Sequence, residues 1–305
     1  MRLVFLGTPA FAVPSLEALV SAGHEVVLVV TQPDRPSGRG QHLTASPVKE
    51  AAARLRLRVY QPERVRRPEA VETLQNVRPE AMVVVGYGQI IPQVVIDIPP
   101  LGILNVHASL LPKYRGAAPV QWAIANGETR TGVTIMRIDA GLDTGDMLAK
   151  GETAIGEDET APELSARLAG AGAALLVETL ARIDGIVAEQ QDAAQATYAP
   201  ILTKEHGRID WKLPAQAIHN RVRGLQPWPG AYTRFRGQQL TIWKSRVSPS
   251  PVGNPGTLAR HPLRVNCGEG MLEPLEVQLE GRKRITGEQF ANGQRITDDD
   301  ILGQS

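Results

Sequence analysis

The first two thirds of the chain alternate short, fully apolar runs with segments of helical periodicity. Residues 3–6 predict a buried strand, residues 14–23 a helix with Leu16 and Leu19 on its inner face, and residues 26–31 a second strand. This order predicts a βαβ unit, in which the crossover is right-handed and the two strands are parallel.

The same alternation continues to residue 180. The further predicted elements are a helix from Pro47, a strand at 59–60, a helix at 68–77, a strand at 81–85, a strand-like run at 132–138 and a helix whose leucines recur between 164 and 180. The predicted fold is therefore an α/β, Rossmann-like, mostly parallel sheet with helices on both faces. The first turn, residues 7–11, lacks the Gly-x-Gly-x-x-Gly spacing of dinucleotide-binding proteins, which disfavours NAD binding.

The pattern changes near residues 200–206. After one short helix, the alternation of apolar and polar positions predicts short strands separated by Gly and Pro turns, at 231–236, 240–247, 263–267 and 275–279. Such a pattern is typical of a small β-barrel of the oligonucleotide-binding (OB-like) class. We therefore expect two domains, residues 1–205 and residues 206–305.

One predicted strand carries polar side chains where it ends. Asn105, His107 and Ser109 are spaced by two within an otherwise apolar run, so an extended backbone would direct all three to one face. In open α/β sheets, ligands bind at the carboxyl ends of the strands. A single histidine near a strand is usually structural, but three polar groups on one face favour a site. A turn-rich acidic loop at 139–146, containing Asp143, supports this interpretation.

These residues carry a family resemblance that covers nearly the whole chain. The run Asn-Val-His-Ala-Ser-Leu-Leu-Pro at 105–112, followed by Gly116 and by Asp143 within Gly-Leu-Asp-Thr-Gly at 141–145, resembles the 10-formyltetrahydrofolate-dependent formyltransferases. Ala108 stands where the family often has Gly, which concerns backbone packing. Among family members, those acting on initiator methionyl-tRNA are most similar. The resemblance implies 10-formyltetrahydrofolate as formyl donor and formylmethionyl-tRNA, used in translation initiation, as product.

The chemistry of formyl transfer suits the three polar residues. A neutral amine attacks the formyl carbon, so negative charge develops on the formyl oxygen. The amide of Asn105 and a protonated His107 could donate to that oxygen. Asp143 could orient the imidazole, favour its charged form and relay the amine proton to the leaving nitrogen. We expect Asn105, His107 and Asp143 to be catalytic, without a covalent intermediate and without a metal.

The resemblance also implies where folate and tRNA bind. The expected folate-binding residues are Tyr87, Gly88, Ile90, Ser109, Leu110, Leu111 and Pro112. Residues 33–47 are predicted to form a loop by composition, and this loop resembles a basic insertion used against the tRNA acceptor stem. The implied contacts there are Arg35 and, principally, Arg39.

Charge is distributed unevenly although the net charge is only +1. Residues 206–305 hold 14 Lys and Arg against 9 Asp and Glu, whereas residues 1–205 hold 19 against 23. A basic second domain indicates a tRNA-binding role. Alternation along residues 232–236 would expose two arginines and turn Phe235 inward. The predicted phosphate contacts are Arg221, Arg223, Arg234, Arg236 and Lys244.

Composition also bears on location and on alternative functions. One cysteine, Cys267, excludes an intrachain disulfide, and the apolar run at the N-terminus is too short for a signal peptide. We therefore expect a soluble, cytoplasmic, monomeric enzyme. One alternative is formylation of a small amine, such as an aminosugar nucleotide or glycinamide ribonucleotide. Another is a non-catalytic RNA- or folate-binding protein, which the intact polar triad argues against.

Overall fold

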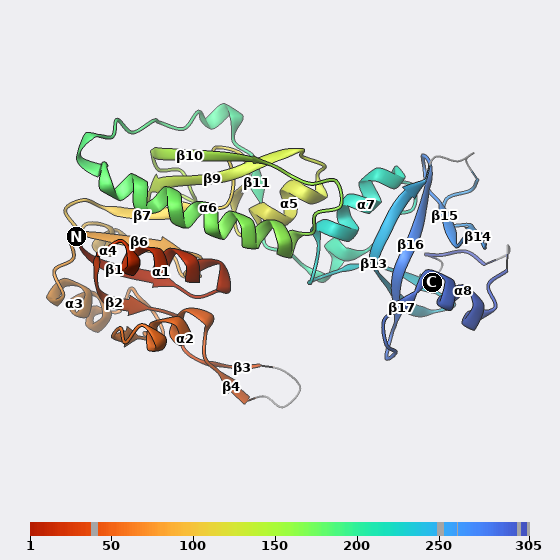
Figure 1. Ribbon diagram of the computed structural model, residues 1–305, viewed down its shortest axis with the longest axis horizontal. Coiled ribbons are helices and arrows are strands. Elements are labelled where there is room, and N and C mark those ends of the chain that lie inside the picture. The colour runs from red at the N-terminus through yellow and green to blue at the C-terminus, as the bar shows by residue number, and fades with distance from the viewer. Residues whose placement is uncertain (38–41, 249–252, 261, 298–299, 304–305) are drawn as a thin grey trace. The chain divides into compact units, whose positions relative to one another are not determined.

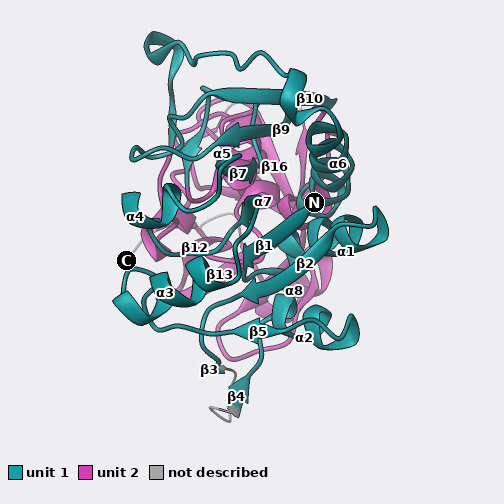
Figure 2. Ribbon diagram, turned by 90° about the vertical axis from the view of Figure 1, so that its left-hand side faces the viewer, with its two compact units in different colours: residues 1–116, 131–153, 165–198 teal, residues 117–130, 154–164, 199–305 magenta. Residues whose placement is uncertain are grey.

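The chain forms two compact units, and the computed structural model describes residues 1–37, 42–248, 253–260, 262–297 and 300–303 (Figures 1 and 2). Unit 1 comprises residues 1–116, 131–153 and 165–198. Unit 2 comprises residues 117–130, 154–164 and 199–305. The predicted domain boundary between residues 205 and 206 stays a prediction, but two segments that precede it in sequence cluster with unit 2.

Unit 1 is built around a seven-stranded sheet in the order β10-β9-β7-β6-β1-β2-β5. Its strands are β1 (Arg2–Gly7), β2 (Glu25–Val30), β5 (Val59–Tyr60), β6 (Ala81–Val85), β7 (Ile103–His107), β9 (Arg130–Arg137) and β10 (Met147–Ala154). The five neighbouring strands β7, β6, β1, β2 and β5 are parallel to one another, and β9 runs antiparallel to β7. The predicted mostly parallel α/β sheet is therefore confirmed.

Helices cover both faces of this sheet. They are α1 (Val13–Ser21), α2 (Pro47–Arg54), α3 (Pro68–Asn76), α4 (Gln93–Ile96) and α6 (Ala161–Ala181), with the short 3-10 turns η1 (Ala10–Ala12), η2 (Ile183–Gly185) and η3 (Ala193–Gln195). On one face Val4 and Leu6 pack in a cluster with Leu74 of α3. On the other face Val106 lies so close to Gly172 of α6 that a Cβ there would be 2.8 Å away.

The segment predicted to be a loop contains a hairpin. Strands β3 (Arg35–Ser37) and β4 (His42–Thr44) pair in antiparallel register, so the prediction of irregular structure is wrong for these residues. Composition misleads here because a two-stranded ribbon tolerates proline at its edge and needs no apolar core. Helix α2 begins at Pro47, as predicted, and the Ser46 hydroxyl caps it by accepting from Lys49 N at 3.1 Å.

Unit 2 contains an antiparallel sheet in the order β12-β13-β16-β15-β14, with β17 paired to β16. Its elements are η4 (Lys204–Gly207), α7 (Ala215–Gly224), β12 (Ala231–Phe235), β13 (Gln238–Ser248), β14 (Leu258–Ala259), β15 (Arg264–Asn266), β16 (Met271–Leu279), β17 (Ile285–Thr286) and α8 (Gly287–Gln294). Phe235 is buried in the core of this unit and lies edge-on to Phe290, which confirms its predicted inward orientation. The remaining elements of the chain are α5 (Pro119–Ala125) and the short strands β8 (Arg115–Gly116) and β11 (Tyr198–Ala199).

Helix α5 and residues 154–164 are held within unit 2 by α7. A Cβ at Gly224 would lie 2.8 Å from the nitrogen of Ala125, so α5 and α7 cross closely at this glycine. The guanidinium of Arg223 is buried, and its Nη1 donates to the carbonyls of Gly156 and Glu159 at 3.0 Å each. These two hydrogen bonds attach the segment before α6 to helix α7.

Helix α6 is the one helix, within the described ranges, that is long and apolar enough to cross a membrane. Only 44% of its most apolar 18-residue window is buried. Core helices of globular proteins pass the same test, and Leu168 and Leu176 of α6 are buried in the protein, so the observation is weak evidence for a membrane span.

His219 of α7 is a buried titratable group beside Arg223. Its Nδ1 shares a hydrogen bond of 3.1 Å with the Ser245 hydroxyl, and its Nε2 lies 3.5 Å from the exposed carboxylate of Asp158. Burial lowers the pKa of His219, and this effect exceeds the opposing influences of a hydrogen bond to the Glu157 backbone and of the Asp158 charge. The folded protein therefore favours the neutral ring.

This burial predicts a loss of stability in mild acid. Because the unfolded chain binds the proton more readily, stability is full above about pH 6.5 and falls as the pH drops through that value. Denaturant unfolding at pH 7.5 and pH 5.5 should show a smaller loss for His219→Gln than for the wild type. His24, whose pKa is also lowered, is present in both proteins. An equal loss in the two proteins would contradict the prediction.

Candidate active site

The candidate site lies at the end of β7, where two polar side chains are buried on one face. Asn105 and His107 come from the strand itself, and both are largely inaccessible. Ser109 follows the strand, and its hydroxyl donates to the carbonyl of Lys113 at 2.6 Å. Ser109 therefore holds the loop after β7 through this bond, and its part in binding a ligand stays a prediction.

A backbone carbonyl fixes the tautomer of His107. Its Nε2 lies 2.9 Å from the carbonyl oxygen of Tyr114. Since a carbonyl can only accept, Nε2 carries a proton and donates it. The other nitrogen, Nδ1, then faces Oδ2 of Asp143 at 3.7 Å. This separation is too long for a hydrogen bond but suits an ion pair once the ring is protonated.

Asp143 is held in an unusual backbone conformation within the loop at 139–146. Its φ is +53°, in the left-handed region that non-glycine residues seldom adopt. Its Oδ2 accepts from Gly116 N at 2.8 Å. The carboxylate of Asp139 braces the same loop by accepting from the Thr144 hydroxyl at 2.7 and 2.9 Å. The loop thus presents the carboxylate to His107 and Gly116 together.

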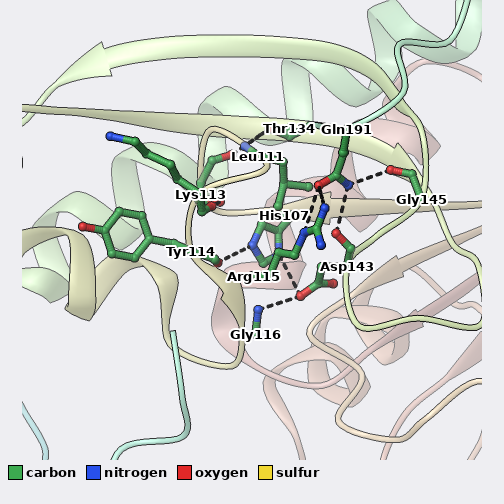
Figure 3. A network of polar contacts seen from close by, with 11 residues as sticks. His107, Leu111, Lys113, Tyr114, Arg115, Gly116, Thr134, Asp143, Gly145 and Gln191 are labelled. Carbon is green, nitrogen blue, oxygen red and sulfur yellow. Dashed lines mark hydrogen bonds and ion pairs between the residues drawn. The ribbon is translucent and has the colours of Figure 1, made fainter. Parts of the chain in front are cut away.

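Two further side chains complete the network in Figure 3. Gln191 donates from Nε2 to the carbonyls of Asp143 and Gly145, at 2.9 and 2.7 Å. Arg115 donates from Nε and Nη2 to Oε1 of Gln191, at 3.0 and 2.8 Å. Sequence reasoning assigned no role to either residue. Arg115 lies within the motif region and offered a signal, whereas Gln191 reaches the site only through long-range packing.

The amide of Asn105 differs from its neighbours because no hydrogen bond to it is found among the described residues. It lies on the same strand face as His107, two residues away. Asn105 as a residue is 9% exposed, and an amide without a protein partner is suited to donate to a ligand atom.

The family of the chain follows from comparison with known sequences. The profile described as "Formyl transferase" matches residues 1–180, and the profile described as "Formyl transferase, C-terminal domain" matches residues 201–295. The chain belongs to the formyl transferase family. The predictions of this family and of a formyl-transferring enzyme are therefore confirmed.

Two relatives in this family match the chain over its full length. A methionyl-tRNA formyltransferase of Solibacter usitatus (strain Ellin6076) is 69% identical over 308 residues, covering 100% of this chain and 99% of the relative. One of the same name from Koribacter versatilis (strain Ellin345) is 56% identical over 310 residues, with 100% and 99% covered. A solved N-formyltransferase from Helicobacter canadensis, in complex with folinic acid and dTDP-3-aminofucose, matches 93% of this chain and 100% of its own. Its TM-score of 0.66 at 19% identity shows a shared fold.

The residues expected to bind the formyl donor of this family fall into two groups. Tyr87 is 1% exposed, and no partner for its hydroxyl is found in the described part of the chain. Its ring is part of the core, and burial raises its pKa. Ile90, by contrast, is 91% exposed, and Gly88 has a φ of +83°. Leu111 is buried against Met136, while Leu110 and Pro112 are half-buried.

The arginines expected to contact tRNA are placed very differently. Arg223 is buried and bonded to backbone carbonyls, so its assignment to a phosphate-contacting surface is corrected. Arg236 is bound through two nitrogens to Asp300, and Arg221 donates to the carbonyl of His206 at 3.2 Å. Arg39 lies outside the described residues. Among the described residues, the predicted tRNA contacts that are exposed are Arg35, Arg234, Arg236 and Lys244.

The position of Asp143 predicts that its charge is essential for formyl transfer. Asp143→Asn retains an oxygen that can accept from Gly116 N but removes the negative charge facing His107. We expect kcat to fall about 10²-fold, because this charge stabilises the protonated ring. Asp146→Asn is the matched control, since Asp146 is an exposed carboxylate in the same loop. Comparable kcat values for the two variants would remove the Asp143 charge from the mechanism.

Proposed function

We propose that this chain transfers the formyl group of 10-formyltetrahydrofolate to the amino group of initiator methionyl-tRNA, giving formylmethionyl-tRNA for translation initiation. The observation that carries the proposal is the placement of His107 between a backbone carbonyl and the carboxylate of Asp143, with the amide of Asn105 on the same face. The full-length relatives, which are named for this reaction, support the acceptor.

In the proposed mechanism the three residues stabilise the negative charge on the formyl oxygen and transfer the proton of the attacking amine. Asn105 donates its amide hydrogen to the formyl oxygen as that oxygen becomes negative. His107, protonated at Nδ1 and stabilised by Asp143, adds a positive charge nearby. Asp143 accepts the proton of the attacking amine through a water molecule and returns it to the leaving nitrogen of folate. No side chain of the protein acts as a nucleophile.

The formyl donor is proposed to bind beside β6 and β7. The exposed Ile90 and the half-buried Leu110 offer apolar surface, and the left-handed backbone at Gly88 lets the chain turn closely around a ring. Ser109, Leu111 and Tyr87 are buried, so their proposed part is to shape the walls of this pocket.

Unit 2 is proposed to bind the tRNA through phosphate contacts. A cavity of about 980 Å³ in this unit is lined by Arg208, Lys212 and Arg234 beside the ring of Tyr232, together with two carboxylates, Glu205 and Asp210. Basic residues next to an aromatic ring are typical of surfaces that follow a nucleic-acid backbone. Arg35 and Arg39 of unit 1 are the proposed contacts to the acceptor stem. We further propose that the protein acts as a monomer in the cytoplasm, where its tRNA substrate is used.

The reaction itself is the direct test. Incubation of the protein with 10-formyltetrahydrofolate and charged initiator tRNA should yield formylmethionine after the aminoacyl bond is hydrolysed. His107→Ala and Asn105→Ala should each lower kcat about 10²-fold or more, because each removes a group that stabilises the oxyanion. Wild-type protein that leaves the methionine unformylated would overturn the proposal.

The exposed basic residues of unit 2 predict a salt-dependent share of tRNA affinity. Replacement of both Arg234 and Lys244 by Ala should weaken tRNA binding and reduce the slope of log affinity against log salt by about one unit per residue. Arg182→Ala removes an exposed charge of the same sign from unit 1 and serves as the control. If the double variant and the control have equal slopes, Arg234 and Lys244 do not contact tRNA phosphates.

A further inference from the structure

Gln191 is a buried side chain whose hydrogen-bonding groups are directed entirely at the site. It is 7% exposed, and its oxygen accepts two bonds from Arg115. Its nitrogen donates to two carbonyls, those of Asp143 and Gly145. A guanidinium only donates and a carbonyl only accepts, so these partners fix which end of the amide is oxygen and which is nitrogen.

Arg115 is a buried cation that the structure pairs with a neutral group. It is 5% exposed, and no carboxylate lies within ion-pair distance of it among the residues described. Burial of a charge without an opposite charge costs stability. Such costs are concentrated at functional positions, where geometry matters more than stability.

The bonds of Gln191 bear directly on the strained residue of the site. The backbone of Asp143 is left-handed, a conformation that few residues other than glycine adopt, although Asp adopts it more readily than most. Gln191 holds the carbonyl of Asp143 and the carbonyl two residues later. Gly116, the neighbour of Arg115, donates its N–H to the carboxylate of Asp143. Residues 115 and 116 thus both act on Asp143 (Figure 3). Arg115 acts through Gln191 on the backbone of Asp143, and Gly116 binds its carboxylate directly.

We propose that Arg115 and Gln191 are positioning residues, which act through Asp143 and set its distance from His107. The assignment rests on the proposed function, because the reaction affected is formyl transfer. Arg115 orients the amide of Gln191, Gln191 imposes the backbone conformation of Asp143, and the carboxylate is thereby held facing Nδ1 of His107.

Two substitutions of Gln191 distinguish the loss of its donor nitrogen alone from the loss of the whole amide. Gln191→Glu keeps an oxygen for Arg115 but sets a second carboxylate oxygen against the carbonyls of Asp143 and Gly145. Gln191→Met keeps the size of the side chain and removes all four bonds. The matched control is Lys150→Met, which breaks an ion pair with Glu189, two residues from Gln191, without touching Asp143.

The kinetic test measures kcat and KM for formyl transfer to methionyl-tRNA. Both Gln191 variants should lower kcat at least about tenfold, because a displacement of about 1 Å in a catalytic group has effects of this order, while KM for each substrate stays near the wild-type value. In an Asp143→Asn background, Gln191→Met should cost much less than it does alone, since its target has already lost its charge. Unchanged kcat, or full additivity in the double variant, would overturn the proposal.

A second measurement does not depend on the substrate. The N–H of Gly116 is bonded to the Asp143 carboxylate, so its hydrogen exchange, followed by NMR, reports whether that carboxylate is in place. Gln191→Met and Gln191→Glu should speed this exchange at least about tenfold, with Lys150→Met unchanged. Unaltered exchange in both Gln191 variants would overturn the positioning role even in a protein that formylates another amine. Failure of the wild type to formylate methionyl-tRNA, with faster Gly116 exchange in these variants, would overturn the proposed function alone.

Discussion

The hydrogen bond from His107 to the carbonyl of Tyr114 is the contact on which the geometry of the site depends. It commits one ring nitrogen to a backbone acceptor and leaves the other for Asp143. The residues at 114–116 therefore determine the direction of the imidazole before any substrate arrives.

The sheet brings Asp143 to this ring by an indirect route. Strand β9 pairs antiparallel with β7, so that Arg137 lies opposite Leu104 and Thr134 lies opposite His107. The chain consequently leaves β9 toward the opposite end of β7 from His107. The loop at 139–146 has to return, and its bracing by Asp139 and Gln191 provides the rigidity that this return requires. A parallel strand at this position would have delivered its following loop to the same edge directly.

Much of the fold could be predicted from the sequence because apolar runs report burial. The strand at 81–85 was predicted with the bounds it has, and the polar spacing identified Asn105 and His107. Other features depend on partners that are distant in sequence. Charge counting cannot distinguish Arg223, which is buried on carbonyls, from the exposed Arg234, since both are arginines in a basic segment. The contacts of Gln191 depend on the path by which the loop at 139–146 returns toward His107, and no local sequence pattern encodes that path.

The division of the chain between the two units has a consequence for folding during synthesis. Helix α5 buries Val120 and Ile124 in unit 2, yet it is translated roughly ninety residues before α7, with which it packs. At the pace of translation this interval lasts about 5–20 seconds. During that time the apolar surface of α5 on the growing chain lacks its packing partner, because α7 has not yet left the ribosome. The order of the elements along the gene thus makes completion of unit 2 a late event, governed by the arrival of its last hundred residues.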